Sequence, residues 1–349
     1  METIEYKALV NYGPEGFRLE TREVAGISDD EILLKVCGCG ICAADTKMYN
    51  GVFYLPAPVA IGHEFYGSVA AMGAGAAKRT GLSEGDFIAV EQIIPCGECR
   101  FCKGGQYWMC ERHAIHGFVS GFGEGGMAEY VVLGKQSIVY KLPINAPDPI
   151  WSLVEPLGCA IHAVSRAGIE PEDTVVLAGL GPIGLLMLQV IMQRKPRLVI
   201  ALDTYENRLN MGVKFGADLV LNPASEDVVA RVKDLTGGYG CDRYIHCSGN
   251  ENAVAQGLSM LRRLGTYVEF SVFAKPATAD WTIVGDGKEL NIFGSHLSPY
   301  TYPDAIDFIG NGSLDARSVI SHVFSLEEYE QAFKTAAKRD ECLRVVLVP

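Results

Sequence analysis

The sequence predicts an α/β protein in which a doubly wound parallel sheet is joined to a second, β-rich domain. Three observations support this prediction. Strand-like apolar runs alternate with helical runs between residues 155 and 296, a glycine-rich turn follows the first of those strands, and short β-type runs separated by Gly and Pro occupy most of the first 150 residues. The length of 349 residues suits two domains.

The β-rich part is predicted from short runs of apolar and β-branched residues that Gly and Pro clusters separate. These runs lie at residues 32–36, 67–72, 87–90 and 127–132. A helix is expected next, at about residues 155–168.

Beyond residue 173 the two patterns alternate, as they do when crossover helices join parallel strands. The expected strands lie at residues 174–178, 197–203, 218–221, 242–247, 266–271 and 290–294. The expected helices lie at residues 183–193, 207–215, 228–235 and 253–264. After about residue 297 we expect helices at 305–309 and 326–335, a strand at 343–348, and a return of this tail to the first domain. The expected domains are therefore 1–154 with 297–349, and 155–296.

Composition narrows the partners and the compartment. The formal net charge of -12 argues against nucleic acid or an anionic membrane as partner, because both require a basic surface. The N-terminus has no basic segment followed by an apolar one, so no signal peptide is expected. Residues 175–192 carry no charge, but three Gly and one Pro interrupt them, so we expect no membrane helix there. Eleven unevenly spaced cysteines favour metal binding in a reducing compartment, and a cytoplasmic protein is expected.

A dinucleotide site is predicted where a glycine motif follows an apolar strand and opens an apolar helix. The motif G-x-G-x-x-G is Gly179-Leu180-Gly181-Pro182-Ile183-Gly184. Such a turn lets a pyrophosphate approach backbone N–H groups at a helix N-terminus, and Pro182 suits the first helical turn.

Asp203 ends the next predicted strand. Its carboxylate can accept hydrogen bonds from the ribose hydroxyls of NAD and would repel the 2′-phosphate of NADP. Arg208 can stack on adenine or hold a 2′-phosphate, and a solvated helix arginine is an equal alternative.

A metal site is predicted in the segment PCGECRFCKGGQYWMC, which holds Cys96, Cys99, Cys102 and Cys110. Four thiolates can close a tetrahedron around zinc and leave no position for water, which is typical of a structural site. An iron–sulfur cluster is the less favoured alternative.

Three further motifs contain residue types that bind catalytic zinc: GICAAD with Cys42, GHE with His63 and Glu64, and VEPLG with Glu155. In this order, with the four-cysteine segment and GLGPIG, the motifs resemble the zinc-dependent medium-chain dehydrogenases over nearly the whole chain. The resemblance is to the polyol and threonine branch, where Glu replaces the third ligand cysteine of alcohol dehydrogenases. The stretches QYWMCERH, LGTYVEFSVF, DWTIVGDGKEL and GSHLSPYTYPDAI resemble those of erythritol/L-threitol dehydrogenases.

The resemblance implies a GroES-like catalytic domain and a Rossmann domain. It also implies catalytic zinc ligands Cys42, His63 and Glu64, with Glu155 as a ligand or water partner. The family usually places Ser or Thr two residues after the ligand cysteine and commonly a His three residues later, and these groups relay the substrate proton. Ala44 and Lys47 occupy those positions here, so the proton is expected to leave through Glu155, water or Lys47.

The expected function is oxidation of a secondary alcohol of a short polyol to a ketose, with NAD as hydride acceptor and zinc as Lewis acid. Relatives are commonly tetramers, so a homo-oligomer is expected. A threonine-type or sugar-phosphate alcohol dehydrogenase is the alternative within the family. A non-catalytic nucleotide-binding protein is the alternative of another class.

Overall fold

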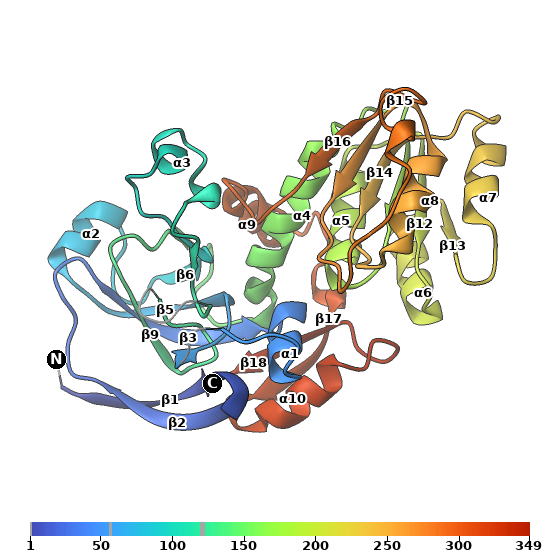
Figure 1. Ribbon diagram of the computed structural model, residues 1–349. Coiled ribbons are helices and arrows are strands. Elements are labelled where there is room, and N and C mark those ends of the chain that lie inside the picture. The colour runs from blue at the N-terminus through green and yellow to red at the C-terminus, as the bar shows by residue number, and fades with distance from the viewer. Residues whose placement is uncertain (1, 56–57, 119–122) are drawn as a thin grey trace. The chain divides into compact units, whose positions relative to one another are not determined.

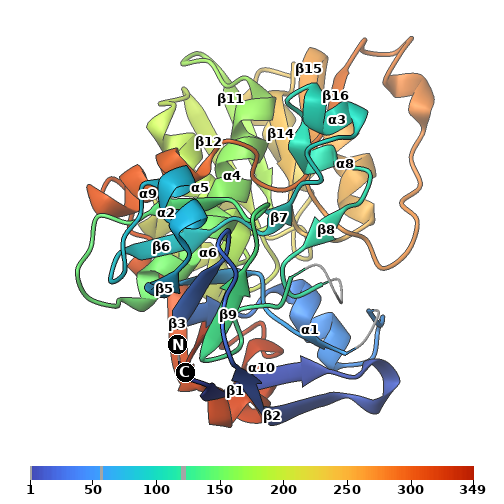
Figure 2. The ribbon, with the colours of Figure 1, turned by 90° about the vertical axis from the view of Figure 1, so that its left-hand side faces the viewer.

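The computed structural model describes residues 2–55, 58–118 and 123–349. The chain divides into two compact units. Unit 1 consists of Met1–Glu155 with Tyr302–Pro349, and unit 2 consists of Pro156–Thr301. The C-terminal segment therefore belongs to the same unit as the N-terminal half. Figure 1 and Figure 2 show the elements of each unit.

Unit 2 is built on a six-stranded sheet with the order β13-β12-β11-β14-β15-β16, and every pairing in it is parallel. Its central strand is buried along its whole length, as expected for a sheet covered on both faces. The strands are β11 (Thr174–Ala178), β12 (Leu198–Leu202), β13 (Leu219–Leu221), β14 (Cys241–His246), β15 (Leu261–Glu269) and β16 (Asn291–Gly294). The doubly wound parallel sheet is confirmed.

Helices cover both faces of this sheet (Figure 1). They are α5 (Pro182–Gln193), α6 (Glu206–Lys214), α7 (Val228–Leu235) and α8 (Asn252–Met260), together with α4 (Val154–Ala167), which begins at the unit boundary, and the 3-10 helix η4 (Trp281–Ile283). The expected helix at 253–264 was too long, because strand β15 already begins at Leu261. Lys288 Nζ donates to the carbonyl oxygens of Leu258 and Ser259 at 2.7 and 2.9 Å and thereby caps the end of α8.

Unit 1 is β-rich, as expected. A seven-stranded sheet has the order β10-β6-β5-β3-β18-β17 with β9 paired to β3, a three-stranded sheet has the order β2-β1-β4, and β7 pairs with β8. The strands are β1 (Ile4–Asn11), β2 (Phe17–Val24), β3 (Ile32–Gly40), β4 (Val59–Ala60), β5 (Glu64–Met72), β6 (Phe87–Val90), β7 (Ile93–Ile94), β8 (Ala114–Ile115), β9 (Tyr130–Leu133), β10 (Val139–Lys141), β17 (Ile320–Ser325) and β18 (Arg344–Val348).

Short helices connect these strands. The α-helices are α1 (Ala43–Tyr49), α2 (Ala74–Thr80), α3 (Arg100–Lys103), α9 (Tyr302–Gly310) and α10 (Tyr329–Ala336). The 3-10 helices are η1 (Gly13–Glu15), η2 (Tyr107–Met109), η3 (Pro149–Leu153), η5 (Arg317–Val319) and η6 (Leu326–Glu328). Among the described residues, no helix combines the length and the apolar character that a membrane span requires.

The core of unit 1 joins both ends of its sequence. Its buried side chains come from β1, β3, β5 and β9 and also from α10 and β18. In both views α10 lies beside the β1–β2 hairpin. The rings of Phe17 and Tyr49 contact Phe333 of α10 with centroid separations of 5.7 and 4.6 Å. Burial of these rings fixes the C-terminal segment on the N-terminal strands.

Candidate active site

Two neighbouring strands bring three of the expected zinc ligands together. Cys42 follows β3 and is the N-cap residue of α1, while His63 immediately precedes β5 and Glu64 begins it. The strands β3 and β5 are antiparallel with Gly40 opposite Glu64, so the end of one meets the beginning of the other. One donor atom each from Cys42, His63 and Glu64 lie within 4.8 Å of one another.

The chemistry of this donor group fits a zinc ion. A sulfur, an imidazole nitrogen and a carboxylate oxygen are the donor types of catalytic zinc sites, which keep one position open. His63 and Glu64 are only 8% and 1% exposed. Burial, and after it the charge of Asp45, raises the pKa of Cys42 to about 12, so the thiolate requires a cation beside it.

Two buried charges that the sequence analysis missed support these donors. Asp45 is fully buried; its Oδ2 accepts from the Cys42 backbone N–H at 2.8 Å, and its Oδ1 lies 3.9 Å from His63 Nδ1. His63 Nε2 lies 3.8 Å from Glu64 Oε1, so each ring nitrogen of His63 faces a different carboxylate. A carboxylate behind a ligand histidine orients the ring and fixes its tautomer.

Arg344 is the second missed charge. It lies in β18, which pairs with β3 beside Gly40, and its guanidinium forms an ion pair with Glu64. An added Cβ at Gly40 would collide with Glu64 Oε2, so the backbone leaves space for this carboxylate. The signal for Arg344 was a single charge at the beginning of the apolar run VVLV.

The four cysteines expected to hold structural zinc also come together. Donor atoms of Cys96, Cys99, Cys102 and Cys110 lie within 4.8 Å of one another, and Cys96 Sγ lies 3.8 Å from Cys102 Sγ. Backbone N–H groups of Glu98 and Cys99 donate to Cys96 Sγ at 3.4 and 3.3 Å, and they lower the pKa of Cys96 to about 6. Four sulfurs, with N–H groups that favour a thiolate, fit a closed tetrahedral zinc site.

The glycine turn lies between β11 and α5. Gly179 has a φ of 112°, and a Cβ there would approach Ser248 Cα to 2.8 Å. A Cβ on Gly184 would collide with the Gly179 carbonyl oxygen. Gly181 is the N-cap of α5, and Pro182 and Ile183 form its first turn, so the turn presents a helix N-terminus suited to a phosphate group.

The acidic residue expected to meet the ribose lies beside this turn. Asp203 accepts from the backbone N–H of Leu180 at 2.7 Å and from that of Tyr205 at 3.0 Å. Arg208 Nη1 lies 3.9 Å from Asp203 Oδ2, and its guanidinium covers the Tyr205 ring at 4.8 Å. Asp203 thus holds the turn by a hydrogen bond and adds negative charge there, and Arg208 places a positive charge beside it.

Comparisons with known proteins agree with this geometry. Residues 28–144 match the alcohol dehydrogenase GroES-like domain, and residues 182–311 match the zinc-binding dehydrogenase family. The chain is 42% identical to the erythritol/L-threitol dehydrogenase of Mycolicibacterium smegmatis, over 98% of this chain and 97% of that protein. The chain belongs to the zinc-dependent medium-chain dehydrogenases. Its place in their polyol branch is supported by the sorbitol dehydrogenase of Halalkalibacterium halodurans, 30% identical over 98% and 99% of the two chains.

A solved structure supports the fold of this medium-chain dehydrogenase. An alcohol dehydrogenase from Escherichia coli CFT073, complexed with NADH, superposes with a TM-score of 0.89, covering 99% of both chains at 26% identity. The expected family and the expected pairing of a GroES-like with a Rossmann fold are confirmed.

Glu155 of the dehydrogenase is not one of the three mutually close donors around Cys42. It is the second residue of α4, is 6% exposed, and its Oε1 accepts from Gln92 Nε2 at 2.7 Å. Its charge contributes to the raised pKa of Cys42, but less than burial and the charge of Asp45 do.

The family resemblance assigns relay of the substrate proton to two positions, which Ala44 and Lys47 occupy in this chain. Ala44 and Lys47 both lie in α1, and Lys47 is partly exposed. The hydroxyl of Thr46, also in α1, donates to the Cys42 carbonyl oxygen at 3.3 Å. Its proton is therefore already engaged by the backbone.

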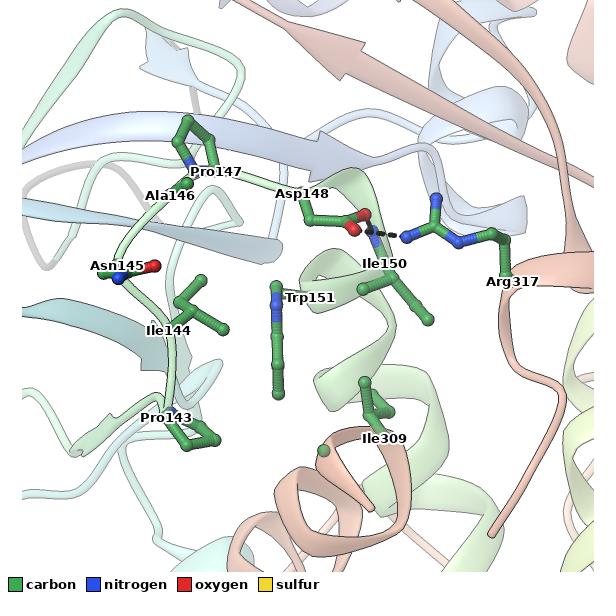
Figure 3. Close-up of a pocket in the computed structure, with 11 residues that line it drawn as sticks. Pro143, Ile144, Asn145, Ala146, Pro147, Asp148, Ile150, Trp151, Ile309 and Arg317 are labelled. Atoms are coloured by element: carbon green, nitrogen blue, oxygen red, sulfur yellow. Dashed lines mark hydrogen bonds and ion pairs between the residues drawn. The ribbon is translucent and has the colours of Figure 1, made fainter. Parts of the chain in front are cut away.

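A surface hollow of about 500 Å³ lies elsewhere in unit 1 (Figure 3). Trp151 stands in it between the 143–147 segment and Ile309, and the ion pair of Asp148 with Arg317 closes one side. Its two charges neutralise each other, and none of the zinc donors lines it. The hollow is therefore separate from the Cys42 donor group.

Proposed function

We propose that this dehydrogenase oxidises a secondary alcohol of a short, uncharged polyol, of the size of erythritol or threitol, to the corresponding ketose. The proposal rests on the Cys42, His63 and Glu64 donor group in a chain 42% identical to an erythritol/L-threitol dehydrogenase. Unit 1 is the catalytic part in this proposal, and unit 2 holds the dinucleotide.

The proposed zinc-binding residues are Cys42, His63 and Glu64, with Glu155 as a fourth ligand or as the partner of a water. Bound zinc supplies a Lewis acid for the alcohol oxygen, and bound NAD supplies the hydride acceptor. Asp45 orients His63, and Arg344 neutralises part of the negative charge of Glu64. Both effects keep the donors in place while the substrate exchanges.

The reaction releases one hydride and one proton from the alcohol. The hydride leaves the carbon for the dinucleotide, and the O–H proton requires a path to solvent. We propose Glu155 as the acceptor of that proton, because its carboxylate is buried and is not one of the three mutually close donors. Asp45 faces the Cys42 N–H group and His63, and the Thr46 hydroxyl is engaged by the backbone. Lys47 is the competing acceptor.

We propose NAD as the preferred cofactor, held by the turn of Gly179, Gly181 and Gly184 with Asp203 at the ribose. The 2′-phosphate of NADP would place negative charge against the Asp203 carboxylate. This like-charge contact would weaken NADP binding by several kcal/mol, about the cost seen at other interfaces.

We also propose a cytoplasmic homo-oligomer, with a tetramer as the expected state. The eleven cysteines, all within the described residues, are free, which suits a reducing compartment. Strand β16 is the edge of the unit 2 sheet, and an exposed edge favours pairing with another chain. Sedimentation velocity measures the state, and a monomer at micromolar concentration would contradict this part.

The function is tested with purified protein and a panel of polyols. We expect NAD reduction with four-carbon polyols, weaker reduction with sorbitol, and two zinc ions per chain by elemental analysis. Cys42→Ser is the control, because it removes one donor of the active-site group only. Reduction of NAD by threonine or a sugar phosphate, but by no polyol, would contradict the proposal.

A further inference from the structure

A buried amide connects Glu155 to a tyrosine at the start of the C-terminal segment. Gln92 lies between β6 and β7 and is fully buried. Its Nε2 donates to Glu155 Oε1 at 2.7 Å, and its Oε1 accepts from the Tyr302 hydroxyl at 3.2 Å. Tyr302 is also fully buried. The three side chains form one hydrogen-bonded row within unit 1.

The hydrogen-bonding capacity of each group fixes the orientation of the amide. An ionised carboxylate only accepts, so Gln92 must present its NH2 group to Glu155 and its carbonyl oxygen to Tyr302. The opposite orientation would place two acceptors against each other. A buried amide in a mispaired orientation is costly, so the Glu155 carboxylate selects this orientation, and the Tyr302 hydroxyl pairs with the carbonyl end of the amide.

The tyrosine is itself held in place. Its hydroxyl lies 3.1 Å from the Val90 carbonyl oxygen, and its ring stacks on Tyr140 with centroids 5.1 Å apart and an angle of 28° between the planes. Tyr302 is the first residue of α9, and it belongs to the GSHLSPYTYPDAI stretch, for which the sequence alone offered no chemical role.

We propose that Gln92 is a positioning residue for the alcohol oxidation, which holds the Glu155 carboxylate by Oε1, and that Tyr302 supports the amide by donating to its carbonyl oxygen. This inference rests on the proposed role of Glu155. A carboxylate on a helix terminus can rotate about its side-chain torsions, and the hydrogen bond to Gln92 selects one rotamer.

The consequence for the reaction is a loss of turnover without a loss of substrate binding. When a group that acts on the reacting atoms is misplaced by about 1 Å, the reaction rate can fall by up to about 10²-fold. Gln92→Met keeps the length and the apolar packing of the side chain but removes the donor. We expect kcat to fall about 10-fold, KM to change less than about twofold, and zinc content to stay at the wild-type value. Tyr302→Phe should lower kcat less, about threefold, because the amide remains present.

Two matched variants control for the loss of a buried polar group. Gln189→Met removes the amide of another buried glutamine, which donates to the Leu185 carbonyl oxygen. Tyr244→Phe removes another buried tyrosine hydroxyl, which donates to the Ala253 carbonyl oxygen at 2.9 Å. Both should change the unfolding midpoint as much as the test variants do, with kcat near the wild-type value.

A double-mutant cycle tests the route of the effect. When Glu155→Gln is already present, Gln92→Met should lower kcat no further, because its target is gone. A spectroscopic measurement on the zinc-loaded protein gives a second readout: the carboxylate stretching band that disappears in Glu155→Gln should shift in Gln92→Met. Gln189→Met should leave that band in place.

The outcomes separate this inference from the proposed function. If Glu155→Gln is impaired but Gln92→Met has the wild-type kcat, or if the losses simply multiply, the positioning role is wrong and the role of Glu155 stands. If Glu155→Gln keeps the wild-type rate, the proposed role of Glu155 is wrong and the inference falls with it. An unshifted carboxylate band would also overturn the inference.

Discussion

Asp45 shows how one short-range contact prepares a metal ligand. The residue lies three positions after Cys42, and the first turn of α1 directs its carboxylate back to the Cys42 N–H group and toward the His63 ring. A single acid thus organises two donors that lie 21 positions apart in the numbering, 42 and 63. A buried carboxylate is costly unless it is hydrogen-bonded, and Asp45 has one such bond, from the Cys42 N–H group, while its other oxygen faces His63.

Two single substitutions test which residue accepts the substrate proton. Glu155→Gln keeps the size of the side chain and accepts a hydrogen bond but takes up no proton, so we expect turnover of polyol oxidation to fall at least ~10²-fold. Zinc content should stay close to the wild-type value, because Cys42, His63 and Glu64 remain. Steady-state rates at several pH values, with zinc analysis, measure both effects.

Lys47→Met is the counterpart of that experiment. It should lower turnover only slightly if Glu155 accepts the proton. A large loss in Lys47→Met together with a small one in Glu155→Gln would assign the path to the lysine, and wild-type rates in both would leave water alone as the acceptor.

We expect the choice between NAD and NADP to depend on one residue, Asp203. Asp203→Ser removes the negative charge beside the glycine turn, so we expect the ratio of kcat/KM for NAD to that for NADP to fall by about 10-fold or more. Asp203 also accepts from Leu180, and serine preserves part of that role. Arg208→Ala serves as control, because it should not shift the preference toward NADP. A wild-type enzyme that prefers NADP would contradict the assignment.

The four-cysteine segment, 96–110, is expected to behave as a zinc-dependent element. Cys99→Ser should remove one zinc per chain and lower the apparent Tm by about 5 °C or more, since a closed metal site contributes folding free energy. Cys42→Ser should abolish activity with a much smaller change in Tm. Elemental analysis and thermal unfolding of both variants decide this, and equal Tm values for Cys99→Ser and wild type would refute the structural assignment.

The sequence indicated the elements of unit 2 well because their strands are short, apolar and separated by helices of ordinary length. Strand β11 and helix α7 have the expected bounds, at 174–178 and 228–235. The β1–β2 hairpin was missed. Its first strand is fully buried over the second half, and its second strand carries four charges on side chains that are half-buried or exposed, so neither shows a clean alternation.

Sequence patterns predicted less of the site than of the fold. The cysteine segment and the glycine turn are local in sequence, and both could be interpreted from chemistry and spacing. Cys42, His63 and Glu64 were connected only through the family resemblance. The antiparallel pairing of β3 with β5 brings them together, and this pairing cannot be recognised from their spacing in the sequence. Arg344 and Gln92 were missed for the same reason: their partners are distant in sequence, and a lone buried charge or amide has no spacing to recognise.

Two buried titratable groups control the stability of the whole molecule in opposite directions. Burial lowers the pKa of His116 to about 4, while its ring contacts the Glu124 carbonyl oxygen and the Ser137 hydroxyl. The folded protein therefore binds the proton less well than the unfolded chain, and stability is lost as pH falls from 6.5 to 4, by up to about 3 kcal/mol. Burial raises the pKa of Glu91 to about 7, so its contribution is lost as pH rises from 4.5 to 7.

These two contributions can be separated by unfolding at different pH values. Relative to wild type, His116→Gln should lose less stability on going from pH 6.5 to 4.5, and Glu91→Gln should lose less on going from pH 5 to 7. Urea unfolding midpoints at four pH values between 4.5 and 7.5 provide the measurement. Parallel pH dependences for the two variants and wild type would show that these groups do not titrate as described.

The return of residues 302–349 to unit 1 has a consequence for how the molecule is made. The ribosome delivers β3, β5 and all of unit 2 before it delivers β18, so Glu64 waits for the ion pair with Arg344 until most of the chain has emerged. Unit 2 is continuous in sequence and can fold during synthesis. Limited proteolysis of stalled nascent chains should therefore find residues 156–301 protected first. The newborn enzyme would then hold a dinucleotide fold earlier than a finished metal centre, and zinc loading becomes a late, near post-translational event.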